Sequence, residues 1–245
     1  MLKLKSSFLL VFVFLQITCY SQNSDKQKNT AISRFQYEGY NSLQDYIHNN
    51  AIFLDEALDN TGVLLAGIVL DKSGEVSKVF TLNSLVSSVD KSILALLEKT
   101  EGHWKPLEDT INHYKIDTIL IPIVYRFMGQ VFKIDRANCK LTVQKEVELT
   151  KLINGQPVGI LNYESTKLLI KKYDNAFAKG KYDEASNISK ELVRREPLNT
   201  DFYSKLILVN MRQGRKFAAC NNLKYVQNYL VIQPDISILQ EVQCN

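Results

Sequence analysis

The stretch GVLLAGIVLDKSGEVSKVF, residues 62–80, decides the fold of this 245-residue chain. It begins with a continuous apolar run of strand length. Asp71-Lys72-Ser73-Gly74 then supplies the residue types of a tight turn, and the segment from Glu75 to Val79 resumes a strand-like composition. The stretch therefore predicts a β-hairpin.

A helix and a long strand follow the hairpin. Ser87 and Asp90 have the spacing of a helix-capping pair, and apolar residues then recur on one helical face. After Trp104-Lys105-Pro106, residues 116–127 alternate with period two, as in a strand. One face of that strand carries Ile119, Ile121, Ile123, Tyr125 and Phe127.

Helical signals also precede the hairpin. Ser42 caps forward to Asp45 at the start of one helix, and residues 51–58 continue as a second short helical piece. The order helix, strand, strand, helix, strand predicts an α+β domain with an antiparallel sheet over residues 36–127.

This order resembles the C-terminal domain of TonB. The resemblance is carried by the turn at Asp71–Gly74, the helix near Asp90, the Trp104-Lys105-Pro106 segment and residues 122–127. The family usually has a Tyr-Pro pair where this chain has Phe53-Leu54. The resemblance implies a sheet whose last strand accepts an extended receptor segment by strand addition.

A repeat occupies the C-terminal third of the chain. Gly180 and Gly214 are 34 residues apart, as are Ala185 and Ala219, and 34 residues is the period of the tetratricopeptide repeat. Residues 180–185 resemble the turn and second helix of that family. We therefore expect all-α helical hairpins over 166–245, ending in a capping helix near 236–242, with Phe217 packing in the last hairpin. Residues 128–165 are interpreted as a linker with partial structure.

The N-terminus predicts export. Residues 1–21 combine Lys3 and Lys5 with a short apolar core and a small Ser21, which is typical of a cleaved signal peptide. A lipid anchor at Cys19 is the alternative. Residues 22–35 are expected to be a flexible segment; they contain no proline, unlike the long spacer of TonB itself. We place the mature chain in the periplasm.

Composition excludes a nucleic-acid partner. The formal charge is +4, and two of these charges belong to Lys3 and Lys5 in the leader. A balanced mature chain lacks the basic footprint of a nucleic-acid-binding protein. The apolar stretch near residues 8–19 is too short to span a bilayer as a helix, so we expect no integral membrane span in the mature chain.

Two partner-binding surfaces are predicted. The first is the last strand, which the resemblance to TonB places at a free sheet edge; Pro122 agrees with an edge or bulge position, because proline cannot donate to a central ladder. The second is the repeat groove, by its resemblance to the tetratricopeptide family. The edge candidates are Ile119, Ile121, Ile123, Val124 and Tyr125, and the groove candidates are Asp174, Phe177, Leu208, Met211 and Arg212.

Three cysteines remain after the leader, namely Cys139, Cys220 and Cys244. In an oxidising compartment Cys220 and Cys244 are the expected pair, and small buried thiols are the alternative. His48, His103 and His113 have no ligand partner at metal-binding spacing, and Trp104 is expected in the core.

No sequence motif of a nucleophile or of a phosphate-binding or dinucleotide-binding loop is present. We therefore predict a non-enzymatic interaction protein without cofactor or metal. The alternatives are an accessory of TonB-dependent transport that contacts an outer-membrane receptor, and an enzyme without a recognisable motif.

Overall fold

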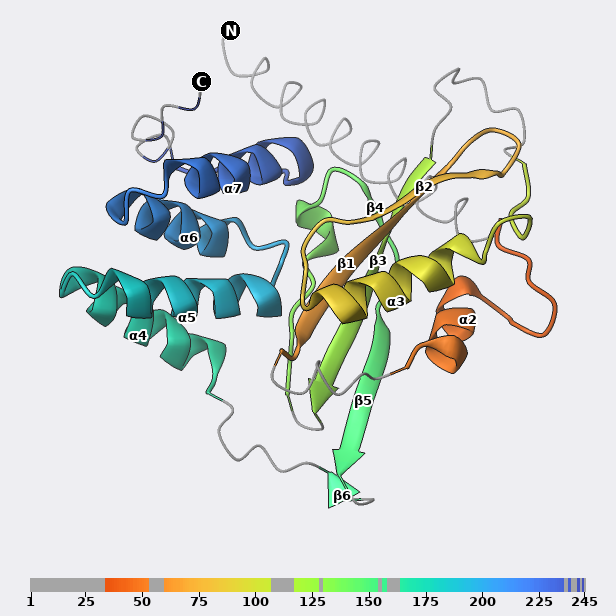
Figure 1. Cartoon of the computed structure of the whole chain (residues 1–245), viewed down its shortest axis with the longest axis horizontal. Helices are drawn as coiled ribbons and strands as arrows, with labels where there is room; N and C mark the ends of the chain where they lie inside the picture. Colours follow the sequence, from red (N-terminus) through yellow and green to blue (C-terminus); the bar gives the residue numbers. More distant parts are fainter. Residues whose placement is uncertain are drawn as a thin grey trace, which may run out of the picture.

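The structure is a computed structural model, and it describes residues 34–52, 60–106, 117–127, 130–153, 156–157, 164–235, 238, 242 and 244. Figure 1 shows a sheet with helices covering one side and a stack of the C-terminal helices on the other. The predicted signal peptide, His113 and most of the predicted C-terminal cap lie outside the described residues. Of the helical piece predicted at 51–58, residues 53–58 also lie outside them, and Ala51 is extended, not helical.

The predicted hairpin and the order of elements around it are confirmed. α2 (Leu43–Asn50) precedes β1 (Gly62–Leu70) and β2 (Val76–Thr81), and α3 (Ser87–Glu98) leads to β3 (Asp117–Phe127). β1 pairs antiparallel with both β2 and β3. Gly74 adopts a φ of +89° in the turn, where its backbone lies against the carbonyl of Trp104.

Helix capping agrees with the sequence in one of two cases. The Ser42 hydroxyl accepts a hydrogen bond from the Asp45 amide at 3.1 Å, as expected. At α3 the N-cap residue is Val86, and Ser87 is already the first helical residue. The Asp90 carboxylate accepts instead from the Leu85 amide at 3.2 Å, so it fixes the chain entering the helix.

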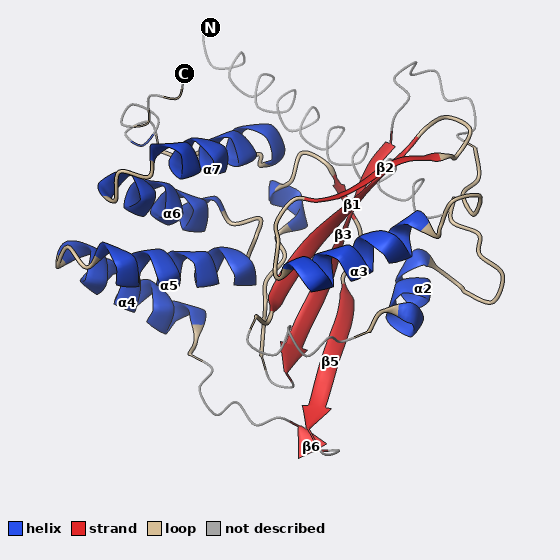
Figure 2. Ribbon diagram, viewed as in Figure 1, coloured by secondary structure: helices blue, strands red, loops and turns tan. Residues whose placement is uncertain are grey.

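The segment interpreted as a linker completes the sheet. It contains a short 3₁₀ turn, η2 (Arg136–Asn138), and the strands β4 (Thr142–Val143), β5 (Val147–Ile153) and β6 (Gln156–Pro157). β4 and β5 both pair parallel to β3, and β6 pairs antiparallel to β5. The sheet is therefore mixed, not antiparallel throughout, with the order β2-β1-β3-β5-β6 (Figure 2).

Both faces of β1 are buried. Leu64, Ala66 and Ile68 pack with residues of α2 and α3, such as Ile47 and Ile93. On the other face, Val63 and Leu65 share a core with the C-terminal helices. This arrangement explains why the first strand is a continuous apolar run. Trp104 is buried, and its indole N–H donates to Thr100 Oγ1 at 3.0 Å, as expected for a core residue.

The C-terminal part consists of two helical hairpins. The first is α4 (Thr166–Ala178) with α5 (Tyr182–Arg195), and the second is α6 (Thr200–Arg212) with α7 (Lys216–Tyr229). Every helix boundary of the second hairpin lies 34 residues after the matching boundary of the first. The 34-residue period is thus confirmed at the level of helices. In the described part of the chain, no helix combines the length and apolar character needed to cross a bilayer.

Candidate functional site

The strand predicted to be a docking edge is paired on both sides. β3 pairs with β1 from Asp117 to Tyr125. On its other side it pairs with β4 at Ile119 and Leu120, and with β5 from Ile123 to Phe127. The prediction of a free edge over Ile119, Ile121, Ile123, Val124 and Tyr125 is therefore wrong; all five are buried in the middle of the sheet.

Pro122 misled the prediction for a physical reason. Leu65 of β1 lies opposite Pro122, and its carbonyl accepts from the Leu82 amide, so its backbone polar groups face β2 and not β3. Two opposite residues of an antiparallel pair either both face each other or both face away. The backbone of Pro122 therefore faces away from β1, whereas the amides of Ile121 and Ile123 face it. The position of Pro122 would therefore direct an amide toward β4 and β5. Pro122 lies where β4 pairing has ended and β5 pairing has not begun. Its missing donor is tolerated at a gap in the ladder.

The predicted groove residues fall into two groups. Asp174 is exposed on α4 and pairs with Lys205 of α6 at 2.6 Å, so it does lie between the first helices of the two hairpins. Phe177 is half-buried between Tyr173 and Tyr182. Leu208 and Met211 pack instead with the C-terminal residues Ile238 and Val242, and Arg212 is exposed at the end of α6.

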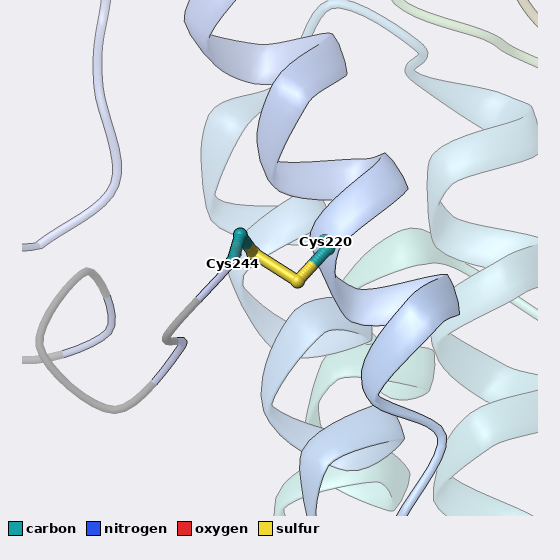
Figure 3. The surroundings of a disulfide bond; sticks show 2 residues. All are labelled: Cys220 and Cys244. Carbon is teal, nitrogen blue, oxygen red and sulfur yellow. A yellow bond between two sulfur atoms is a disulfide. The ribbon is translucent and has the colours of Figure 1, made fainter.

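A disulfide holds this C-terminal segment, and it is the pair that the sequence predicted. Cys220 of α7 is bonded to Cys244 (Figure 3). The bond joins the segment to the apolar cluster formed by Ile207, Ala219 and Leu223. Among the described residues the remaining thiol is that of Cys139; it is buried, and burial raises its pKa. It is therefore protonated at neutral pH and a poor nucleophile.

Asn138 joins the second hairpin to the sheet segment, and no sequence pattern predicted this role. Its side-chain amide donates to the carbonyl of Leu198 and to Thr200 Oγ1 at 3.3 Å. Its Oδ1 accepts from the Ile232 amide at 2.8 Å. The start of α6 and the end of α7 thus meet on one buried asparagine. A single polar residue outside any periodic pattern cannot be recognised as such a node from sequence.

A small cleft of about 200 Å³ lies beside this node. Leu198 and Ile232 supply its apolar wall, and Lys133 lies among the carboxylates of Asp135, Glu196 and Asp201. The lining is therefore net negative. Asn138, Thr200 and Ile232, which line the cleft, are already hydrogen-bonded to one another: besides the bonds of Asn138, Thr200 Oγ1 donates to the Ile232 carbonyl at 2.8 Å.

The two described histidines lie apart. His48 Nδ1 is 3.2 Å from the carbonyl of Glu148 in β5. His103 stacks on the ring of Tyr37 with a centroid distance of 3.7 Å, and the other face of Tyr37 stacks on Tyr46 at 4.9 Å. Among the described residues, no group of three or more His, Cys, Asp or Glu side chains is arranged to hold a metal ion.

The titrating groups with raised pKa values are mainly tyrosines in packed layers. Burial, and then the adjacent Tyr225, raises the pKa of Tyr203 well above its ordinary value. The two rings stack at 4.6 Å, and the Tyr225 hydroxyl donates to the carbonyl of Pro197 at 3.1 Å. Tyr203 and Tyr225 therefore hold α6 against α7.

Comparison with known proteins gives no match to a protein-family model, to a curated protein or to a solved structure. The similarities to the TonB domain and to the tetratricopeptide repeat therefore remain resemblances of sequence pattern.

Proposed function

We propose that this chain is a non-enzymatic, exported protein-interaction module of a bacterial envelope, and that its partner binds the open face of α4 with the adjoining part of α6. The proposal rests on the observation that this side of α4 is exposed and carries side chains of mixed chemistry. α4 packs on α5 through Leu169, Tyr173 and Ala176, whereas Lys167, Lys171 and Asn175 are exposed one turn apart along its outer side.

The face carries one large apolar residue among charged and polar groups. Leu168 is a large apolar residue with 42% of its surface exposed. Asp174 and Lys205 connect the two helices through a charge pair, and the Lys205 ammonium lies 4.5 Å from the centroid of the Tyr173 ring. A partner segment that lies along α4 would meet an exposed leucine and charges of both signs.

The helices that present this face are held rigidly. The guanidinium of Arg194, at the end of α5, donates to Asn60 Oδ1 at 3.0 Å, next to the start of β1. The Tyr173 hydroxyl donates to the Lys205 carbonyl at 2.8 Å and so fixes α4 against α6. A pre-organised face loses little conformational entropy on binding, which favours affinity.

The test is site-specific photo-crosslinking in intact cells. A photoreactive residue at Lys171 is expected to capture a discrete protein, while the same residue at Lys91, which is exposed on α3, captures none. Asp174→Lys should abolish capture because it places two ammonium groups together on the face. Glu98→Lys, an equal charge reversal on α3, is the control. Equal capture at Lys91, or capture unaffected by Asp174→Lys, contradicts the proposed surface.

Export is tested separately by mass spectrometry of the mature N-terminus. We expect a chain that begins near Gln22, because the basic start, short apolar core and small residue of the leader are those of a cleaved signal. A chain that begins at Met1, or at a lipid-modified Cys19, would move the protein to a different compartment or to a membrane anchor.

A further inference from the structure

The end of the helical array that points away from the sheet combines cations with one exposed aromatic ring. Figure 1 shows the α4–α5 turn and the α6–α7 turn at this far end. The turns are adjacent, since Gln213 Nε2 donates to Asp183 Oδ1 at 2.7 Å. We call this end the distal tip and define it by Lys179, Lys181, Arg215, Lys216 and Phe217.

Phe217 has no packing role at this position. It is 80% exposed, the highest value among the large apolar residues of the described chain that are exposed. The expectation that it packs within the second hairpin is therefore wrong. The equivalent residue of the first hairpin, 34 positions earlier, is Asp183, whose side chain is 93% exposed. The helical fold accepts a fully solvated aspartate here, so it does not require phenylalanine.

The charge around Phe217 is positive. Lys179 and Lys216 are exposed, and neither forms an ion pair with any described residue. Lys181 pairs with Glu184 at 3.5 Å and Arg215 approaches Asp183 at 3.9 Å, with all four side chains at least half exposed. Two carboxylates thus face the four cations of the tip, and exposed pairs of this kind are weak.

We propose that the distal tip attaches the protein to the surface of an anionic lipid bilayer. The tip is formed by two adjacent turns, and a flat, charged surface can meet both turns at once. Cations attract anionic headgroups, and a protruding phenylalanine enters the boundary between headgroups and acyl chains. The lysine stems can lie along that boundary while their ammonium groups stay in water. This attachment is independent of the α4 face.

The test is sedimentation with lipid vesicles, using the chain from Gln22 onward, which contains every described residue and lacks the apolar leader. Binding is expected to vesicles that contain phosphatidylglycerol and not to pure phosphatidylcholine vesicles. Phe217→Ser should weaken it by about tenfold or more, because it deletes the buried ring. Removing Lys179 and Lys216 together by Gln substitution should cost about fivefold for each charge.

Matched controls lie elsewhere on the same helices. Val231→Ser removes an exposed apolar residue, 54% exposed, just beyond the other end of α7, and should leave binding unchanged. Lys190→Gln with Lys224→Gln removes two exposed charges from α5 and α7 away from the tip. Each variant is checked by circular dichroism. In a Phe217→Trp variant, tryptophan emission should shift to the blue when anionic vesicles are added, because the ring leaves water.

Three outcomes would overturn the proposal. They are equal binding to phosphatidylcholine vesicles, binding to anionic vesicles that Phe217→Ser does not weaken, and the absence of vesicle binding by the folded chain. If polyglutamate binds the tip while anionic vesicles do not, the surface is a site for an acidic protein and the membrane assignment is wrong.

Discussion

The two helical hairpins have the same register but different surroundings. The first is held against the sheet at α5: a Cβ added at Gly62 would lie 2.4 Å from Arg194 Cγ, so only glycine allows this approach. The second is held by Asn138 and by the disulfide to Cys244. Residues at equivalent positions differ with these surroundings. Ser186 is buried in the first hairpin, and the equivalent residue of the second hairpin is Cys220, which forms the disulfide. The repeat period sets the backbone, and the neighbours of each hairpin select its side chains.

Opening the disulfide should have the largest effect, and only on the second hairpin. The bond joins residues 24 positions apart, and closing a loop of this length stabilises a protein by about 3 kcal/mol. Cys244→Ser should lower the free energy of unfolding by roughly that amount, as measured in urea. Hydrogen exchange should accelerate in α7 and remain slow in α5. Equal acceleration in both helices would show that the hairpins unfold as one unit.

Removing the hydrogen bonds of the Asn138 side chain should have the second largest effect on stability. Asn138→Ala leaves the Ile232 amide and the Leu198 carbonyl without their present partner, at a cost of about 2 kcal/mol. We expect the loss to appear as faster exchange at the start of α6 and the end of α7. The Asn138→Asp variant keeps the acceptor but places a buried carboxylate against the Leu198 carbonyl, so it should not restore the stability of the parent. If Asn138→Ala is as stable as the parent, the node does not hold the second hairpin.

Enlarging an equivalent buried alanine in each hairpin should destabilise the two hairpins to different extents, by less than the changes above. Ala185 and Ala219 are equivalent and both fully buried. Ala185→Leu should cost about 1 to 2 kcal/mol, because α5 is enclosed by α4, α6 and β1. Ala219→Leu should cost less, since its neighbours include Ile238 and Val242 of the terminal segment, which can shift. Thermal unfolding of both variants gives the comparison, and a larger cost at Ala219 would reverse our order.

Exchanging the exposed pair should have the smallest effect on stability. Asp183→Phe and Phe217→Asp concern side chains that are mostly solvated, so each should change the free energy of unfolding by less than about 0.5 kcal/mol. A larger loss for Phe217→Asp in a urea titration would mean that the ring packs against the array.

Local patterns predicted the elements well, and non-local pairing was the source of error. The turn at Gly74 and the 34-residue period depend on neighbours in sequence, which composition and spacing report directly. β5 was not predicted as a strand of the sheet. Its partner β3 is separated from it in sequence by other segments, and no pattern within residues 147–153 indicates which strand they pair with. Pro122 was interpreted as a sign of a sheet edge, but a gap between two partner strands looks the same in sequence as a free edge.

The candidate surfaces show the same division. The pairing of Cys220 with Cys244 was predicted because it would join the terminal helix to the repeat, whereas the partial burial of Leu208 and Met211 depends on where the terminal segment packs. Helical spacing gives the face of a helix but not what covers it. Phe217 is the opposite case, because its hydrophobicity suggested burial and no neighbour is present among the described residues to provide it.

The double burial of β1 has a consequence for the order of folding. Its two faces are covered by residues from different parts of the chain: α2 and α3 lie close by in sequence, while the helices that cover Val63 and Leu65 begin about a hundred residues later. A chain that emerges N-terminus first therefore exposes an apolar strand face until its last third arrives. A fragment that ends at Phe127 would keep that face open and would also leave β3 without β5. We expect such a fragment to aggregate, and the nascent chain to depend on a chaperone during this interval.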